Sequence, residues 1–177
     1  TMPNDFWVFG YGSILWKVDF PFVERRTAHI KGWTRRFYQG SVDHRGIPGN
    51  PGRVVTLTDS PKEICFGIAY RLSNEGLEDT LAALDHRERG GYDRLEIDLH
   101  LETGHRVNGI TYFASDANPN YLGHAETRDI AQQILGARGP SGENVEYVLR
   151  LEQTLSEIGS PDDHVTDIAN HLRKMRR

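Results

Sequence analysis

The sequence has little cysteine, since Cys65 is the single one among 177 residues. One thiol forms no disulfide within the chain, which excludes the disulfide-rich class of small secreted proteins and fits a reducing compartment. Long apolar runs are missing as well, because no stretch of about 18 apolar residues occurs in the printed sequence. No basic segment followed by an apolar one marks a signal peptide. We therefore expect a cytoplasmic protein without a membrane segment.

Positive charge is not in excess, because the formal net charge is -4. Such a chain has no general attraction for phosphate backbones, which argues against nucleic acid as the partner and favours a small molecule. Hydrophobic residues make up 37% and charged residues 26% of the sequence, a composition typical of a globular domain. We expect residues 1–177 to form a single domain that needs no obligate protein partner.

Several catalytic and binding motifs are absent from the sequence. Its eight histidines form no HExxH motif and do not pair with cysteine at zinc-ligand spacing, so we predict no metal. Neither GxxxxGK nor GxSxG occurs, which removes the support for a P-loop nucleotide site or a serine hydrolase. Cys65 lies between Ile64 and Phe66, where a buried, unreactive thiol is the favoured interpretation.

Residue patterns predict strands first and helices later. Aromatic and β-branched segments bounded by turn residues predict strands at 7–11, 29–42, 54–58, 64–72, 95–101 and 107–113. Asp59–Lys62 is expected to be the hairpin connection between the third and fourth of these. One helix is expected between Asn74 and Gly90, because Leu77, Leu81 and Leu84 fall at helical spacing.

The last third of the chain changes to helical periodicity. We expect helices around 130–135, 145–158 and 165–172, the last with Ser160 as its N-cap and Pro161 as its first residue. Because strands precede helices without regular alternation, the predicted class is α+β with a mixed, mainly antiparallel, barrel-like sheet. One helix is inserted into this sheet and the other helices follow it.

The segment FGYGSILW places Gly10 and Gly12 around Tyr11 and is followed by Ser13 and Ile14. Consecutive backbone N–H groups at such a turn can point at an anion or a carbonyl oxygen. An ordinary tight turn is the alternative interpretation. The segment is not a dinucleotide fingerprint, because its third glycine is missing.

Two further segments carry candidate polar groups. In LDHRERGGYDR, Glu88 lies at or just past a helix end among arginines, so it is either a tuned general base or part of a solvated, salt-bridged surface. Arg35, Arg36 and Arg53 flank the glycine-rich loop 43–52 and are either a clamp for a carboxylate or solubilising surface charges. Tyr147 in GPSGENVEY is either a core aromatic or a hydrogen-bond donor in a pocket.

Taken together, these blocks resemble the ChaC-type γ-glutamylcyclotransferases, a family specific for glutathione. The resemblance is carried, in the same order along the chain, by WVFGYGSILWKVDFPF, RRFYQGSVDHRGIPGNPGRVVTL, GIAYRL, LDHRERGGY, NPNYLG, IAQQI and GPSGENVEY. It implies a cyclotransferase fold and cleavage of glutathione into 5-oxoproline and cysteinylglycine without metal or organic cofactor. One departure is the order Ile14-Leu15 where the family commonly has Leu-Ile, which keeps volume and polarity.

The resemblance also assigns site residues. Its catalytic glutamate matches Glu88, which we expect to act as general base and then general acid. The turn that holds the γ-glutamyl group matches Gly10, Tyr11, Gly12, Ser13 and Ile14, and the tyrosine of the late motif matches Tyr147.

Three points stay open at this stage. The turn is expected to bind either the substrate α-carboxylate or the developing oxyanion. Loop 43–53 with Arg53 is a candidate to close over the cysteinylglycine end. The alternatives to glutathione cleavage are a cyclotransferase for other γ-glutamyl amines or dipeptides, and a ligand-binding or regulatory module that has lost catalysis.

Overall fold

The computed structural model describes residues 5–176, except for the side chains of Arg87 and Glu88. Its strands are β1 (Trp7–Gly10), β2 (Phe22–Ser41), β3 (Gly52–Leu72), β4 (Asp93–Leu101), β5 (Arg106–Phe113), β6 (Arg138–Gly139) and β7 (Gly142–Glu143). Its helices are the 3-10 helix η1 (Ser13–Leu15) and the α-helices α1 (Leu77–Arg89), α2 (Thr127–Leu135), α3 (Asn144–Glu157) and α4 (Asp163–Met175).

The described chain forms two compact units. The first comprises the described residues up to Thr34 together with Leu57–Asn118, and the second comprises Arg35–Thr56 and the residues from Pro119 onward. Strands β2 and β3 contribute residues to both units, so neither unit is one continuous stretch of sequence. The expectation of a single domain over 1–177 stays a prediction.

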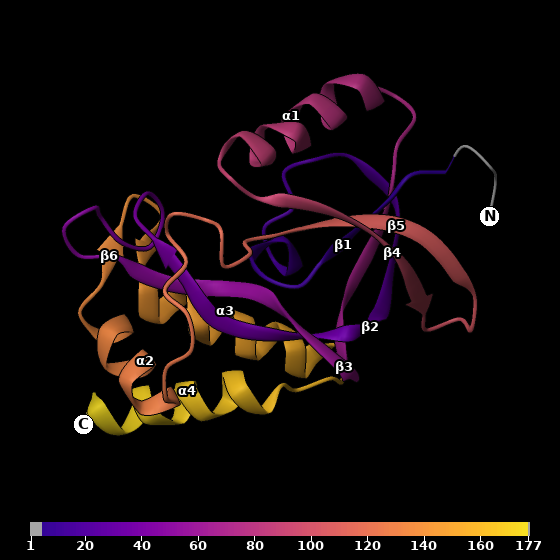
Figure 1. Cartoon of the computed structure of the whole chain (residues 1–177). Helices are drawn as coiled ribbons and strands as arrows, with labels where there is room; N and C mark the ends of the chain where they lie inside the picture. The colour runs from indigo at the N-terminus through magenta and orange to yellow at the C-terminus, as the bar shows by residue number, and fades with distance from the viewer. Residues whose placement is uncertain (1–4, 177) are drawn as a thin grey trace. The chain divides into compact units, whose positions relative to one another are not determined.

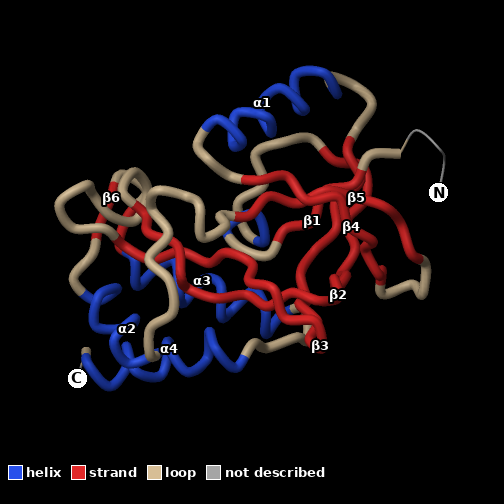
Figure 2. Tube along the Cα trace, in the orientation of Figure 1, coloured by secondary structure: helices blue, strands red, loops and turns tan. Residues whose placement is uncertain are grey.

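The main sheet is a closed barrel with the strand order β1-β3-β2-β4-β5 (Figure 2). The pairs of β1 with β3, β2 with β4, and β4 with β5 are antiparallel. The barrel closes through a parallel pairing of Val8 in β1 with Ile110 in β5. This mixed, mainly antiparallel barrel followed by helices confirms the predicted α+β class.

One strand prediction is wrong. Asp59–Lys62 does not form a hairpin connection, because β3 runs without interruption from Gly52 to Leu72. Pro61 has no backbone N–H to donate. It lies in an exposed stretch of β3, where water can satisfy a carbonyl that lacks this donor. Turn-forming residue types therefore stand inside a strand at this point.

The core of the first unit comes from the apolar positions of the predicted strands. Phe9, Ile30, Ile68 and Leu99 are almost completely buried, one from each of four strands of the barrel. Helix α1 follows β3 and leads back to β4 (Figure 1). It ends before Gly91, whose φ of 89° is the left-handed conformation that glycine adopts at helix ends.

The second unit is built on three helices. Helices α3 and α4 lie side by side (Figure 1) and bury Leu151, Leu155, Ile168 and Leu172 against one another and their surroundings. These apolar residues recur at helical spacing, as expected for amphipathic helices. Within residues 5–176, none of the helices combines the length and apolar character needed to cross a membrane.

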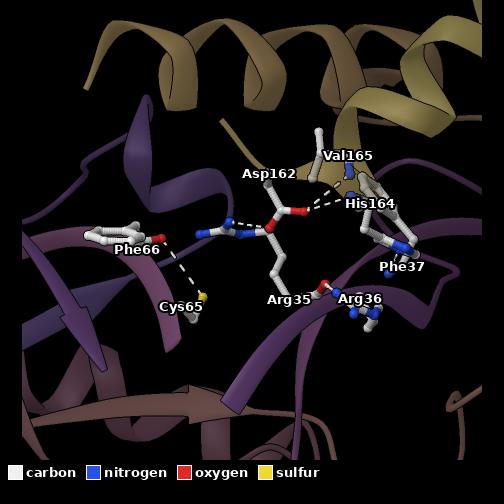
Figure 3. A network of polar contacts seen from close by, with 8 residues as sticks. All are labelled: Arg35, Arg36, Phe37, Cys65, Phe66, Asp162, His164 and Val165. Carbon is white, nitrogen blue, oxygen red and sulfur yellow. Dashed lines mark hydrogen bonds and ion pairs between the residues drawn. The ribbon is translucent and has the colours of Figure 1, made fainter. Parts of the chain in front are cut away.

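The start of α4 differs from the prediction. Its N-cap is Asp162 rather than Ser160, because the Asp162 carboxylate accepts hydrogen bonds from the N–H groups of His164 (3.0 Å) and Val165 (3.3 Å). The other carboxylate oxygen of Asp162 lies 2.7 Å from the guanidinium of the buried Arg35 (Figure 3). Asp162 is the N-cap instead of Ser160 because its carboxylate can both accept from the first N–H groups of the helix and pair with a buried guanidinium.

Candidate active site

The chain turns sharply after β1 into the single turn of η1. The N–H of Leu15 donates to the carbonyl of Gly12 (2.9 Å), and the N–H of Lys17 donates to the carbonyl of Ser13 (2.8 Å). Gly10 allows a close approach of Ile14: a Cβ at position 10 would lie 3.0 Å from Cγ2 of Ile14, so a larger residue would have to displace that side chain. The structure therefore brings the predicted residues Gly10 to Ile14 together in one compact turn.

Backbone donors are available at this turn. Among the described residues, the N–H groups of Gly12, Ser13 and Ile14 donate to no acceptor. The first N–H groups of any helical turn lack intrahelical acceptors, and Ser13 is exposed while Gly12 is half-buried. The turn thus has the donor arrangement that suits an anionic oxygen.

Two tyrosine hydroxyls of the first unit hold the turn through hydrogen bonds to backbone carbonyls. The Tyr11 hydroxyl donates to the carbonyl of Tyr112 (2.7 Å), and the Tyr70 hydroxyl donates to the carbonyl of Ile14 (2.7 Å). Burial raises the pKa of Tyr70, against a smaller opposing effect of Arg25, so this hydroxyl keeps its proton. Sequence reasoning missed Tyr70, although it lies in the block GIAYRL that carries the resemblance.

Glu88 lies in the last turn of α1, in the same unit as the turn. Its side chain is outside the described part of the structure, so its role stays a prediction. Nearby, Asp85 of α1 forms an ion pair with Arg94 of β4 (3.6 Å), and both side chains are about half exposed. This ion pair therefore lies at a charged and partly solvated surface near the end of α1.

Tyr147 belongs to the second unit, where α3 places it in the core. Its ring is buried and packs edge-on against Phe37, with ring centroids 5.9 Å apart. The guanidinium of Arg45 lies 5.7 Å from the ring centroid, and the hydroxyl accepts a hydrogen bond from the N–H of Val55 (3.2 Å). These contacts give Tyr147 a packing role, and its substrate-binding role stays a prediction.

The clamp interpretation is wrong for Arg35 and Arg53. The buried Arg35 guanidinium is paired with Asp162, and Arg53 donates to Oε1 of Gln133 (2.6 Å) and to the carbonyl of Phe37 (2.9 Å). Burial also lowers the pKa of Arg53. Both guanidinium groups are buried in contacts that hold the second unit together, so they are not solubilising surface charges either.

Backbone contacts anchor the loop between β2 and β3. The N–H of Arg53 donates to the Asn144 side chain, which donates back to the Arg53 carbonyl. A Cβ on Gly46 would lie 2.1 Å from the nitrogen of Gly52, so two parts of the loop backbone touch.

Across residues 5–176, with Arg87 and Glu88 set aside, no three His, Cys, Asp or Glu side chains form a metal-binding group.

Comparison with known proteins identifies close relatives of the whole chain. A family model described as "ChaC-like protein" matches residues 6–175. "Gamma-glutamylcyclotransferase 2-3" of Arabidopsis thaliana is 47% identical, over 94% of this chain and 88% of its own length. Human "Glutathione-specific gamma-glutamylcyclotransferase 1" is 38% identical, over 98% of this chain and 81% of its own.

Two more distant relatives extend the comparison to a bacterium and a solved structure. The "Glutathione-specific gamma-glutamylcyclotransferase" of Escherichia coli K12 is 35% identical, over 96% of this chain and 73% of its own length. A crystal structure of the glutathione-specific enzyme from yeast superposes with a TM-score of 0.87 at 27% identity, covering 96% of each chain. The latter likeness confirms the predicted fold family.

Proposed function

Because the chain belongs to the ChaC-like protein family, we propose that it degrades glutathione by cyclising the γ-glutamyl group, which releases 5-oxoproline and cysteinylglycine. The names of the human and bacterial relatives support glutathione as the substrate. The structural observation that carries the proposal is the turn after β1, with the N–H groups of Gly12, Ser13 and Ile14 available for an anion.

The reaction needs no external nucleophile. The substrate's α-amine attacks its own side-chain carbonyl, a C–N bond forms that closes the five-membered lactam, and the amide C–N bond to cysteine breaks. The α-amine is mainly an ammonium at neutral pH, so a base must take its proton and an acid must protonate the leaving nitrogen. One carboxyl group serves both steps in turn.

We assign these two proton transfers to Glu88. Its place in the sequence, near the end of a helix and among arginines, leads us to expect opposing influences on its carboxylate, because a helix C-terminus disfavours negative charge and arginines favour it. A general base and acid must both lose and gain a proton during one turnover, which a carboxyl group can do. The α-carboxylate of the γ-glutamyl group then binds the backbone donors at 12–14, with Gly10 and Tyr11 shaping that turn.

A second candidate function rests on the Arabidopsis relative. Its printed name gives γ-glutamylcyclotransferase and does not mention glutathione. At 47% identity it is more similar to this chain than the human enzyme, which is 38% identical. The alternative is therefore a cyclotransferase that accepts other γ-glutamyl amines. Both functions use the same turn and the same carboxyl group.

The test is turnover by the purified protein of glutathione and, in parallel, of γ-glutamylalanine. Mass spectrometry follows 5-oxoproline and the released amine, in buffer with and without EDTA. Turnover of glutathione alone supports the specific assignment, and turnover of the dipeptide assigns the broader activity. A folded protein that converts neither substrate contradicts the proposal and favours a binding module.

Location and cofactor use follow from the same proposal. We infer a cytoplasmic enzyme, supported by the single cysteine, which fits a reducing compartment. The cyclisation is complete with one carboxyl group and backbone donors, so we expect activity to be unchanged by EDTA.

A further inference from the structure

We propose that Tyr70 is a positioning residue for catalysis: through the Ile14 carbonyl, its hydroxyl holds the turn at 12–14 in the conformation that binds the substrate α-carboxylate. This inference rests on the proposed function and deepens it. Tyr70 touches neither the substrate nor Glu88 in this proposal. Its hydroxyl also interacts with Arg25, but its effect on catalysis is exerted through the turn.

The hydrogen bond from Tyr70 decides where the short helix stops. The carbonyl of Ser13 accepts from both Trp16 (3.1 Å) and Lys17 (2.8 Å), whereas the carbonyl of Ile14 accepts from the Tyr70 hydroxyl (2.7 Å). The next carbonyl of the helix is therefore bound to the barrel instead of to a further helical N–H. This fixes the peptide plane that follows Ile14.

The barrel holds the Tyr70 side chain in place. Tyr70 is fully buried in β3 and is paired in register with Val8 of β1. Its ring contacts Phe20 and Phe22 edge-on, with centroid distances of 5.6 and 5.1 Å. A side chain packed on all sides keeps one rotamer, so the position of the hydroxyl is set by the barrel.

Ile14 is restrained at its side chain as well as at its carbonyl. Its side chain is buried, and its Cγ2 atom lies over Gly10. The peptide plane after Ile14 also carries the N–H of Leu15, which donates to the Gly12 carbonyl (2.9 Å). The restraint on Ile14 therefore extends back to the peptide that carries the Ser13 N–H. A displacement of about 1 Å in a positioning group is enough to reduce catalysis by about a hundredfold.

The test compares Tyr70→Phe with Thr111→Val. Tyr70→Phe keeps the ring and removes the hydroxyl. The Thr111 hydroxyl also donates to a β1 carbonyl, that of Phe9 (2.8 Å), and is buried, so Thr111→Val removes a similar bond outside the turn. Each variant loses one buried hydrogen bond, and we expect both to stay folded, as melting curves will check.

The two variants and the wild type are assayed with two substrates. One is glutathione, and the other is 4-aminobutanoyl-cysteinylglycine, which keeps the reacting amine and amide but lacks the α-carboxylate. For Tyr70→Phe we expect kcat/KM on glutathione to fall by about 10- to 100-fold, mainly through KM, and on the analogue by less than about threefold. Thr111→Val should change both values by less than about threefold.

Two results would overturn the role of Tyr70. One is an equal loss on both substrates, which places the effect outside carboxylate binding, and the other is a loss no larger than that of Thr111→Val. A wild type that does not convert glutathione is a different result, because it contradicts the proposed function before any variant is compared.

Discussion

The imidazole Nε2 of His164 accepts a hydrogen bond from the backbone N–H of Phe37, with 3.0 Å between the two nitrogens (Figure 3). Only an imidazole without a proton on Nε2 can accept this bond. Burial, with a further contribution from Arg36, lowers the pKa of His164 to about 4, although Asp162 and Asp167 act in the opposite direction. The neutral ring therefore ties the start of α4 to β2.

This relationship predicts a loss of stability in mild acid. The unfolded chain takes up a proton at His164 near pH 6.5 and the folded chain only near pH 4, so the contribution is complete above about pH 6.5 and is lost as the pH falls toward 4. The full difference is about 3 kcal/mol. Urea unfolding of wild type and His164→Gln between pH 4 and 8 measures it.

The glutamine variant keeps an acceptor for the Phe37 N–H and does not titrate. Carboxyl groups that titrate in the same range affect both proteins, so the difference between the two curves isolates the histidine. Parallel curves across the whole pH range would contradict the low pKa.

Tyr11→Phe separates the side chain of the turn from its backbone. The Tyr11 hydroxyl is bonded to the Tyr112 carbonyl (2.7 Å), so its removal should lower stability by about 1 kcal/mol. Because the donors for substrate belong to the backbone, kcat/KM on glutathione should fall by less than about tenfold. A loss of a hundredfold or more would give the hydroxyl itself a direct role in catalysis.

Gly67→Ala tests the close approach of β3 to β1. A Cβ on Gly67 would lie 2.2 Å from the carbonyl oxygen of Gly10 and 2.7 Å from Cζ of Phe9. The backbone of β1 must shift to admit it, and we expect a loss of about 2 to 3 kcal/mol in the free energy of unfolding together with reduced turnover.

Gly136→Ala is the matched control for that substitution. Gly136 has nothing within 4 Å of its Cβ position, and its φ is -96°, so alanine fits without strain. Urea midpoints of the two variants give the comparison. Equal midpoints would show that β1 and β3 tolerate a methyl group between them.

Glu88→Gln tests the assigned proton transfers. The amide keeps the size of the side chain and removes its acid–base function, so we expect turnover of glutathione to fall by about a hundredfold or more with little change in melting temperature. Asp85→Asn is the control at the same helix end, since Asp85 forms a partly exposed ion pair with Arg94 and its loss should change turnover by less than about threefold. Wild-type-like turnover by Glu88→Gln would remove this residue from the mechanism.

The sequence predicted those elements whose local signals agree with the fold. Helix α1 was found because leucines at helical spacing end at Gly90-Gly91, and Gly91 does adopt a left-handed φ of 89°. The paired strands β4 and β5 were found because alternating residues flank Thr103-Gly104, and Gly104 has a φ of 91°. In both places a glycine occupies a position with a positive φ, which residues with a side chain rarely adopt.

Predictions failed where tertiary contacts decide. Ser160 has the residue type of an N-cap, but Asp162 takes the position because the buried Arg35, far away in sequence, needs a carboxylate. The brace from Tyr70 to Ile14 also joins distant residues, so no local pattern points to it. The turn itself was predictable as a compact loop because its glycines, Gly10 and Gly12, are separated by one residue only in the sequence.

The closure of the barrel sets an order for biosynthesis. The contacts that join β1 to β5 include the bond from Thr111 to Phe9, which spans 102 positions. Loop-closure entropy makes contacts at such separation slow to form, and on the ribosome they must wait for β5 to be translated. During synthesis β1 can therefore pair with β3 first. It lacks its other neighbouring strand, β5, until most of the first unit has been translated.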